Sequence, residues 1–437
     1  MTTPVLTGAG QDTGPVSNPD TGPDSGPDSG PDAGHDVATG SMPLIYLVAG
    51  EPSGDLLGAR LMSAIDDLTE GQVRFAGVGG PNMVARGLKT LFPIDELAVM
   101  GIVEILPHAL KIFRRIKQTR AAVLRDRPAV LVTIDSPSFT LEIAEGLKGE
   151  GIPLVHYVAP QVWAWKAWRA KHVAKYLDLL LALLPFEPPY FEKHGLRTKF
   201  VGHPAVEGRG QSTAVQADTA ATDVGSFRQR YGIAENARVV CVLPGSRKGE
   251  VSRLSKVFGE GLEQLAEQVP HLHAVVPTVS NVAALAREQT AAWQIPVTVV
   301  EGFAEKHDAF QESEAALAAS GTVAVELAVA GVPTVIGYRA NAITAWLAPY
   351  ILKIKYVSLP NLLLDRQIVP ELLQGSLTPQ SIASNLSALM EGGDQRQRQL
   401  DEFQKVVGVL TPDGESPSMV AARQILAQIK HLPATGR

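Results

Sequence analysis

The sequence of 437 residues contains a single cysteine and no long hydrophobic run. Cys241 has no disulfide partner within the chain, which fits a reducing compartment, and its apolar neighbours predict an inert residue of a buried strand. No stretch approaches the ~18 consecutive apolar residues of a spanning helix, and the first residues lack the pattern of a secretory signal peptide. We therefore expect any contact with a membrane to be peripheral.

Motifs for metal and phosphate binding are also missing. Beyond the first forty residues there is no Asp-x-Asp pair, no Gly-x-x-x-x-Gly-Lys-Ser/Thr loop, and no Cys or His cluster with metal-ligand spacing. We predict no metal and no cofactor.

A net charge of −6, from 39 basic and 45 acidic residues, gives the whole chain no attraction to nucleic acid, so an anionic partner has to meet a local basic patch.

Composition divides the chain into four parts. Residues 1–42 are rich in Gly, Pro, Asp, Ser and Thr and are predicted to form a disordered tail. A second polar stretch, residues 207–226, is predicted to link two domains that cover residues 43–206 and 227–437. The last helices are expected to pack back on the first domain or on a partner subunit.

Short, continuously apolar segments alternate with helical patterns in both domains. They lie at residues 44–49, 129–134, 153–157 and 179–183 in the first domain and at 239–243, 273–276, 297–300, 315–318 and 333–336 in the second, with helices from about residues 55, 250 and 322. Continuously apolar strands are typical of parallel sheets covered on both faces. The prediction is an α/β protein of two doubly wound, Rossmann-like domains that face each other across a cleft.

Two loops of the first domain follow predicted strands and carry candidate functional residues. Glu51 and Ser53 lie in Gly50-Glu51-Pro52-Ser53-Gly54-Asp55, whose glycines allow a close backbone approach; a plain tight turn is the alternative. Asp135 follows the strand at 129–134 and is either the N-cap of the next helix or a general base. The second role suits a hydroxyl nucleophile, which reacts poorly until a carboxylate takes its proton.

Two loops of the second domain have the character of an anion site. Gly245-Ser246-Arg247 offers backbone donors and a guanidinium to a diphosphate. Ser320-Gly321-Thr322 begins a helix, whose N–H groups and dipole favour an anion, and Glu326 lies one turn further, within reach of a ribose diol. A simple helix cap with an ordinary surface Glu326 is the alternative, but two such loops in one domain favour a nucleotide.

A basic helix in the first domain is a candidate membrane contact. From Lys111 to Arg127 there are seven basic residues and one acidic residue, and Lys111, Arg114 and Arg115 share one helical face. This face is either solvated or docked on anionic lipid head groups.

Three of the five tryptophans lie together beside cations, at Trp163, Trp165 and Trp168. Trp next to Lys and Arg suits an interfacial or acyl-contacting site, although buried packing explains at least one of them equally well.

Six motifs, in this order, resemble those of lipid-A-disaccharide synthases. The resemblance runs from about Pro43 to about Ile429. The motifs are Ala49-Gly50-Glu51-Pro52-Ser53-Gly54-Asp55, Val99-Met100-Gly101-Ile102-Val103-Glu104, Ile134-Asp135-Ser136-Pro137, Tyr157-Val158-Ala159-Pro160-Gln161-Val162-Trp163-Ala164-Trp165, Leu243-Pro244-Gly245-Ser246-Arg247 and Tyr356-Val357-Ser358-Leu359-Pro360-Asn361-Leu362.

The resemblance implies transfer of 2,3-diacylglucosamine from UDP-2,3-diacylglucosamine to 2,3-diacylglucosamine 1-phosphate, which gives a β-1,6-linked disaccharide 1-phosphate and UDP in lipid A biosynthesis. It also implies an inverting glycosyltransferase of the B-type fold. Such an enzyme attaches peripherally to the cytoplasmic face of the inner membrane of a Gram-negative bacterium, as a homodimer whose subunits can exchange C-terminal segments. By the family pattern Asp135 is the general base, Glu51 and Ser53 lie on the acceptor side, and the UDP side holds Arg247, Ser320, Gly321, Thr322 and Glu326.

The chain departs from the family pattern at Ser138, where some relatives carry a second carboxylate. A mechanism with two acids is therefore in doubt, while Asp135 stays in place. The alternatives are another UDP-sugar enzyme of the same fold, such as a sugar 2-epimerase or a transferase to a different lipid carrier, and a non-catalytic, nucleotide-binding membrane adaptor. Release of UDP from acylated donor and acceptor distinguishes the synthase from both.

Overall fold

The computed structural model describes residues 42–97, 105–163, 168–207, 226–319, 321–340 and 355–429. The predicted tail, most of the predicted linker, the motif at 99–104, Trp165 and Ser320 lie outside the described residues. Within the described ranges no helix is long and apolar enough to cross a bilayer.

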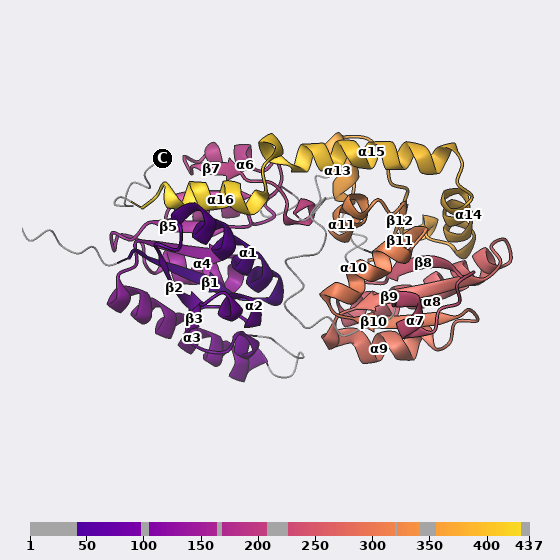
Figure 1. Cartoon of the computed structure of the whole chain (residues 1–437), viewed down its shortest axis with the longest axis horizontal. Coiled ribbons are helices and arrows are strands. Elements are labelled where there is room, and N and C mark those ends of the chain that lie inside the picture. The colour runs from indigo at the N-terminus through magenta and orange to yellow at the C-terminus, as the bar shows by residue number, and fades with distance from the viewer. Residues whose placement is uncertain are drawn as a thin grey trace, which may run out of the picture. The chain divides into compact units, whose positions relative to one another are not determined.

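The first domain is built on a seven-stranded parallel sheet (Figure 1). The strand order is β3-β2-β1-β4-β5-β6-β7, so the chain moves outward from β1 in one direction and then crosses to β4 and continues in the other. The strands are β1 Leu44–Ala49, β2 Arg74–Val78, β3 Lys89–Thr90, β4 Val130–Ile134, β5 Leu154–Tyr157, β6 Leu179–Ala182 and β7 Thr198–Phe200.

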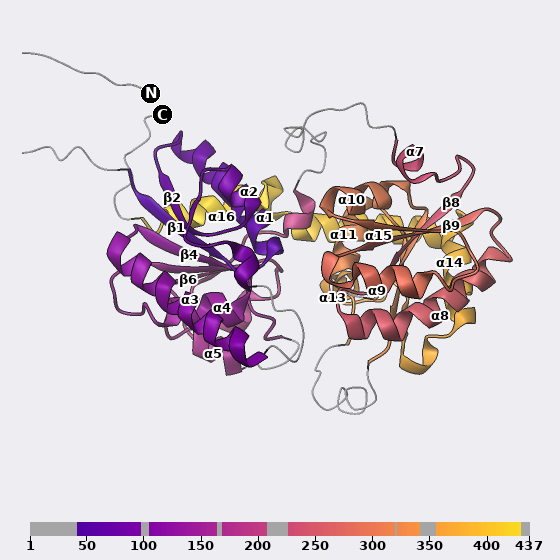
Figure 2. The same ribbon diagram turned by 90° about the horizontal axis from the view of Figure 1, so that it is seen from below.

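Helices cover both faces of this sheet, with α1 on one face and α3, α4 and α5 on the other (Figure 2). This is the arrangement that continuously apolar strands require, because both of their faces have to be buried. The elements are α1 Pro52–Thr69, α2 Pro81–Ala85, η1 Ile94–Leu97, α3 Ile105–Asp126, α4 Pro137–Glu145, α5 Trp168–Val173, α6 Pro188–Glu192 and η2 Pro204–Val206.

The second domain repeats the scheme with a six-stranded parallel sheet in the order β10-β9-β8-β11-β12-β13. The strands are β8 Arg238–Leu243, β9 Leu272–Thr278, β10 Val297–Glu301, β11 Ala315–Ala318, β12 Thr334–Tyr338 and β13 Glu371–Leu373. Cys241 is fully buried in β8, as predicted, and burial raises the pKa of its thiol.

Successive residues of the central strands of this sheet face opposite hydrophobic cores. Val240 and Val242 pack with α8 and α14, whereas Cys241 packs with α11 and α15. The elements are α7 Phe227–Tyr231, α8 Lys248–Ala266, α9 Ser280–Thr290, α10 Phe303–Glu312, α11 Val323–Ala330, α13 Leu359–Leu364, η3 Gln374–Ser376, α14 Pro379–Met390, α15 Asp394–Leu410 and η4 Pro412–Gly414. Two doubly wound parallel-sheet domains are thus confirmed.

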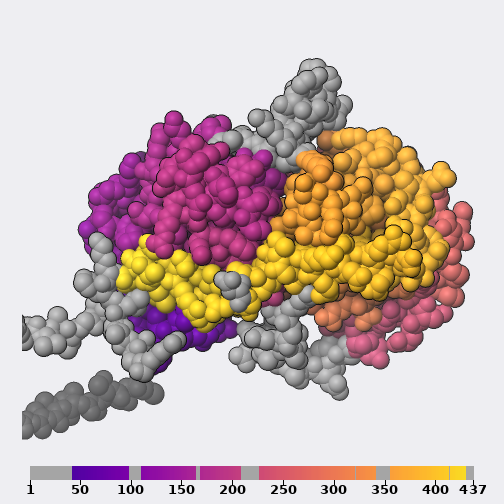
Figure 3. Space-filling view, turned by 90° about the horizontal axis from the view of Figure 1, so that it is seen from above, coloured from indigo at the N-terminus to yellow at the C-terminus, as the bar shows by residue number. Residues whose placement is uncertain are grey.

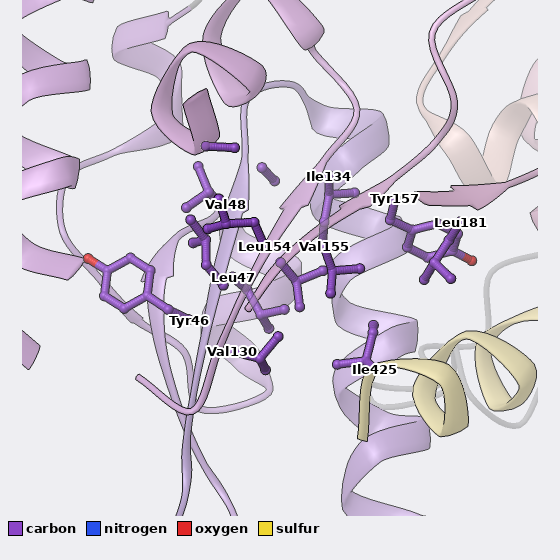
Figure 4. Close-up of a cluster of buried hydrophobic side chains, with 14 of the residues drawn as sticks. Tyr46, Leu47, Val48, Val130, Ile134, Leu154, Val155, Tyr157, Leu181 and Ile425 are labelled. Atoms are coloured by element: carbon purple, nitrogen blue, oxygen red, sulfur yellow. The ribbon is translucent and has the colours of Figure 1, made fainter. Parts of the chain in front are cut away.

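The last helix, α16 (Pro417–Leu426), returns to the first domain and packs along α1 (Figures 1 and 3). Its residues Ala421, Ala422 and Ile425 are completely buried in the core of the first domain. Figure 4 shows Ile425 directed toward the side chains of the central strands. The first domain is therefore completed by a helix that lies more than 200 residues after its last strand in the sequence.

Candidate functional site

Asp135 lies at a sharp corner where β4 ends. Asp135 and Ser136 both have left-handed backbone conformations, with φ of 51° and 44°, which are uncommon for residues other than glycine. The Asp135 N–H donates to the carbonyl of Tyr157, at the end of β5, over 2.9 Å. Ser136, and not Asp135, is the N-cap of α4. The corner is therefore fixed by backbone contacts, and its half-buried carboxylate does not cap the helix.

The loop after β1 brings Ser53 to this corner. The Ser53 hydroxyl donates to Oδ2 of Asp135 over 3.3 Å. A Cβ atom at Gly50 would lie 2.6 Å from the Ser136 side chain, so this close approach of the two loops requires glycine. Glu51, exposed at the N-cap of α1, lies in the same loop. Two of the loops selected from the sequence thus meet at the carboxyl edge of the first sheet.

Asp55, the last residue of the loop motif after β1, binds the beginning of α2. The sequence analysis missed this role. Its buried carboxylate accepts hydrogen bonds from the backbone N–H groups of Gly80, Asn82 and Met83 and from the Asn82 amide, at 2.8–3.0 Å. These donors form the beginning of α2, so Asp55 joins the loops after β1 and β2. The sequence signal was Gly79-Gly80-Pro81, because proline marks the first position of α2 and the N–H groups on either side of it need an acceptor.

Trp163 lies in the loop after β5 and is directed inward. Its Nε1–H donates to Glu187 over 3.3 Å, and its ring packs edge-on against Phe186 with centroids 5.4 Å apart. Burial raises the pKa of the Glu187 carboxyl from 4.5 to about 7. Of the three tryptophans predicted to contact lipid, Trp168 is 65% exposed, whereas Trp163 is half-buried and packs against the core.

The loop after β8 is compact and has an internal partner that the sequence analysis missed. Gly245 has a φ of 117°, which favours glycine. Arg247 is the N-cap of α8, and its exposed guanidinium forms an ion pair of 2.9 Å with Glu250. The Ser246 N–H donates to the same carboxylate over 3.2 Å.

The loop after β11 lies against the beginning of α13. A Cβ atom at Gly321 would lie 2.3 Å from the carbonyl oxygen of Val357, so only glycine fits. Thr322 is the N-cap of α11, and Glu326 in the first turn forms a 2.5 Å ion pair with Lys306 of α10. The Glu326 carboxylate, which was predicted to accept hydrogen bonds from a ribose diol, is therefore already paired with Lys306.

Glu371, the first residue of β13, organises the motif at residues 356–362. Its carboxylate accepts hydrogen bonds from the N–H groups of Val357 and Ser358, the Ser358 hydroxyl and the Asn361 amide. Ser358 and Asn361 are completely buried. The motif thus packs against the Gly321 loop, and its polar residues bind Glu371.

On α3 the basic face is divided between paired and exposed residues. Lys111 and Arg115 both form ion pairs with Glu96, at 3.2 and 2.5 Å, and hydrogen bonds from Arg115 hold the pKa of Glu96 below its usual value. Arg115 also stacks 4.5 Å above the ring of Phe92. Arg114 remains exposed.

Large apolar side chains are exposed on the same helix, namely Leu110 at 71% and Phe113 at 61%. Lys117 follows on this face and is also exposed. A helical face that combines exposed apolar groups with cations is typical of interfacial contact. Among the described residues, no group of three or more His, Cys, Asp or Glu is placed to hold a metal ion.

The two doubly wound parallel-sheet domains show the B-type glycosyltransferase fold. The model of the family described as lipid-A-disaccharide synthetase matches residues 45–425. The chain therefore belongs to the lipid-A-disaccharide synthase family and is a glycosyltransferase.

Several relatives bear this name. The lipid-A-disaccharide synthase of Rhodospirillum centenum is 48% identical over 88% of this chain and 94% of its own length. Those of Paramagnetospirillum magneticum and Pseudomonas putida are 47% and 39% identical, over 89% and 88% of this chain and 98% of each relative. The alternatives of an epimerase, another transferase or a silent adaptor are not favoured.

Solved structures share the fold at low sequence identity. The UDP-GlcNAc 2-epimerase of Neisseria meningitidis, bound to UDP-GlcNAc, has a TM-score of 0.57 and 12% identity over 88% of this chain and 98% of its own. The glycotransferase of kitacinnamycin has a TM-score of 0.56 and 16% identity over 89% and 99% of the two chains. These similarities show the fold only. The evidence for the reaction comes from the family to which the chain belongs.

Proposed function

We propose that the protein transfers 2,3-diacylglucosamine from UDP-2,3-diacylglucosamine to 2,3-diacylglucosamine 1-phosphate. The acceptor's 6-hydroxyl attacks the anomeric carbon, the bond from that carbon to the UDP oxygen breaks, and inversion gives a β-1,6 linkage. The names of the relatives supply the reaction class. The observation that carries the mechanism is the contact between Ser53 and Asp135 at the edge of the first sheet.

In this proposal Asp135 accepts the proton of the attacking hydroxyl. Its carboxylate is half-buried at a fixed corner, and the hydrogen bond from Ser53 leaves Oδ2 able to accept a second one. Glu51 and Ser53 provide the acceptor side of the site. Since Ser138 cannot act as an acid, one carboxylate performs the proton transfer.

The second domain is proposed to hold UDP. Gly245, Ser246 and Arg247 face the diphosphate, while the N-terminus of α11, with Gly321 and Thr322, adds N–H groups and a favourable dipole. Glu326 accepts hydrogen bonds from the ribose, and Lys306 keeps its carboxylate in place. Ser320 belongs to the same proposed set. These donors compensate the charge that develops on the departing diphosphate.

Membrane attachment is proposed to involve α3 and Trp168. Acylated substrates reside in a bilayer, and the exposed Leu110 and Phe113 lie beside Arg114 on a helix of the first domain. Lys111 and Arg115, which are paired with Glu96, contribute a smaller net charge to this face. The protein would thus work on the cytoplasmic face of the inner membrane, where the negative lipid surface attracts the remaining cations.

A homodimer is proposed from the family resemblance alone, and sedimentation velocity of the purified protein tests it. The reaction is tested by incubating the protein with both acylated substrates and measuring the products by mass spectrometry. The expected products are the tetraacyl disaccharide 1-phosphate and UDP in equal amounts. Release of UDP without the disaccharide, or formation of an epimerised UDP-sugar, would contradict the proposal.

A further inference from the structure

The loop after β8 contains an acidic side chain inside its own set of anion donors. Oε2 of Glu250 accepts a hydrogen bond of 3.2 Å from the Ser246 N–H, and Oε1 accepts one of 2.9 Å from Nη1 of Arg247. A Cβ atom at Gly245 would lie 2.5 Å from the same Oε2. The carboxylate therefore occupies the space next to the Cα atom of Gly245, where the side chain of any other residue would lie.

Burial distinguishes this contact from an ordinary surface ion pair. The side chain of Arg247 is 80% exposed, whereas that of Glu250 is only 13% exposed. An acidic residue in the first turn is favoured by the helix dipole wherever it points. The dipole alone does not explain why both carboxylate oxygens face the loop, one toward a backbone donor and one toward a guanidinium.

A carboxylate and a phosphate compete for such donors, because both are anions that accept charge-assisted hydrogen bonds from N–H groups. A diphosphate that reaches the Ser246 N–H and Arg247 has to displace Glu250 or be repelled by it. When the nucleotide leaves, the same carboxylate can return and satisfy both donors.

We propose that Glu250 is an intramolecular competitor of the nucleotide diphosphate. Without a nucleotide it holds Gly245, Ser246 and Arg247 in the binding arrangement, and after the reaction it replaces UDP on the donors and so speeds product release. Glu250 is thus a positioning residue that acts through Arg247. The inference rests on the proposed nucleotide site of the second domain.

The test compares UDP binding by wild type with that of Glu250→Gln, Arg247→Gln and the double variant. Glutamine keeps a hydrogen-bond acceptor but lacks the negative charge. We expect Glu250→Gln to bind UDP about tenfold more tightly, which equals about 1.4 kcal/mol, with slower dissociation. Arg247→Gln should bind more weakly, and in its background Glu250→Gln should gain less than about threefold. Isothermal titration calorimetry and stopped-flow displacement measure these quantities.

The matched control is Glu260→Gln, which removes one negative charge from the same helix α8, about 15 Å further along its axis. Its UDP affinity should stay within about twofold of wild type. A purely structural Glu250 predicts weaker or unchanged binding in Glu250→Gln, and either result overturns the inference. A full tenfold gain that persists without Arg247 indicates a general field effect and also overturns it. If wild type does not bind UDP, the nucleotide site of the proposed function fails as well.

Discussion

The hydroxyl of Ser53 donates a hydrogen bond to Oδ2 of Asp135, across 82 residues of sequence. Gly50 makes this contact possible, because any larger residue there would collide with the side chain of Ser136. The contact joins two loops that end neighbouring strands, β1 and β4. It is the most direct geometric support for a base at Asp135.

Asp135→Asn is expected to lower turnover by ~10²-fold or more, because the amide cannot take the proton of the acceptor hydroxyl. Affinity for UDP should stay near that of wild type, since the proposed nucleotide donors belong to the second domain. Steady-state kinetics and calorimetry measure the two effects. Asp67→Asn, an exposed change on α1, is the control and should be neutral. Turnover of Asp135→Asn at the wild-type rate would remove Asp135 from the mechanism.

Ser53→Ala is expected to reduce turnover by about fivefold, as loss of one hydrogen bond to a charged group does at an exposed site. The carboxylate remains in place because its Oδ1 still accepts a hydrogen bond of 2.8 Å from the Ser136 N–H, and the Asp135 N–H still donates to Tyr157. Ser138→Ala removes an exposed hydroxyl three residues beyond Asp135 and should leave turnover unchanged. Equal rates for the two variants would mean that Ser53 does not position the base.

Activity is expected to survive an excess of EDTA. The sequence has no Asp-x-Asp pair beyond its first forty residues, and the departing diphosphate is proposed to be stabilised by N–H groups and Arg247. The measurement is the initial rate of UDP release with EDTA and with added magnesium or manganese. A rate that requires one of these ions would show that the phosphate site is misplaced.

Arg114→Gln together with Lys117→Gln is expected to weaken binding to anionic vesicles by roughly tenfold or more at low salt. Each cation near an anionic surface contributes ~1 kcal/mol before screening. Co-sedimentation with anionic and neutral vesicles over a range of ionic strengths measures this effect. Lys256→Gln with Arg398→Gln, two exposed changes in the second domain, is the charge-matched control.

Thermal unfolding separates the paired cations of α3 from the exposed ones. Arg115→Gln should lower the melting temperature, because Glu96 loses its closest partner and the ring of Phe92 loses its stacked cation. If Arg114→Gln with Lys117→Gln binds anionic vesicles as well as wild type, this face is merely solvated.

Glu187→Gln is expected to remove a pH-dependent part of the stability. Burial raises the pKa of this carboxyl from 4.5 to about 7, so the folded state favours the neutral form. Its contribution to the free energy of unfolding is fully present below pH 4.5 and is lost as pH rises through 7. The difference between the two pKa values corresponds to a change of at most about 3 kcal/mol in the free energy of unfolding.

Thermal unfolding at several pH values between 4.5 and 8 measures this contribution. The stability of wild type should fall relative to Glu187→Gln over this range, and Glu192→Gln, an exposed change on α6, should follow wild type. Parallel stability curves for wild type and Glu187→Gln would contradict the prediction.

Continuously apolar strands were predictable from the sequence because they are buried on both faces. Thus the strands at residues 44–49 and 315–318 were predicted with their observed bounds. Short edge strands such as β3, with two exposed residues, carry no such pattern. The helix expected from residue 55 begins at Pro52, since proline at the first helical position is favourable and does not break the helix.

Candidate site residues such as Asp135 were predictable because they lie in loops that directly follow predicted strands. Partners that packing brings together were not predictable. The pairing of Lys306 with Glu326 joins two helices, and the inward direction of Trp163 depends on Glu187 in the loop after β6. All three tryptophans were predicted to contact lipid because they lie together beside cations, and the sequence does not distinguish exposed rings from packed ones.

The position of α16 has a consequence for how the protein is made. A ribosome releases the first domain's strands and helices long before it synthesises Ala421, Ala422 and Ile425, which are fully buried in that domain's core. Until then the apolar side chains of α1 and the sheet that pack against α16 are left uncovered. The domain that emerges first is thus the last to be finished, and a chain cut short after α15 would leave it open to aggregation and proteolysis.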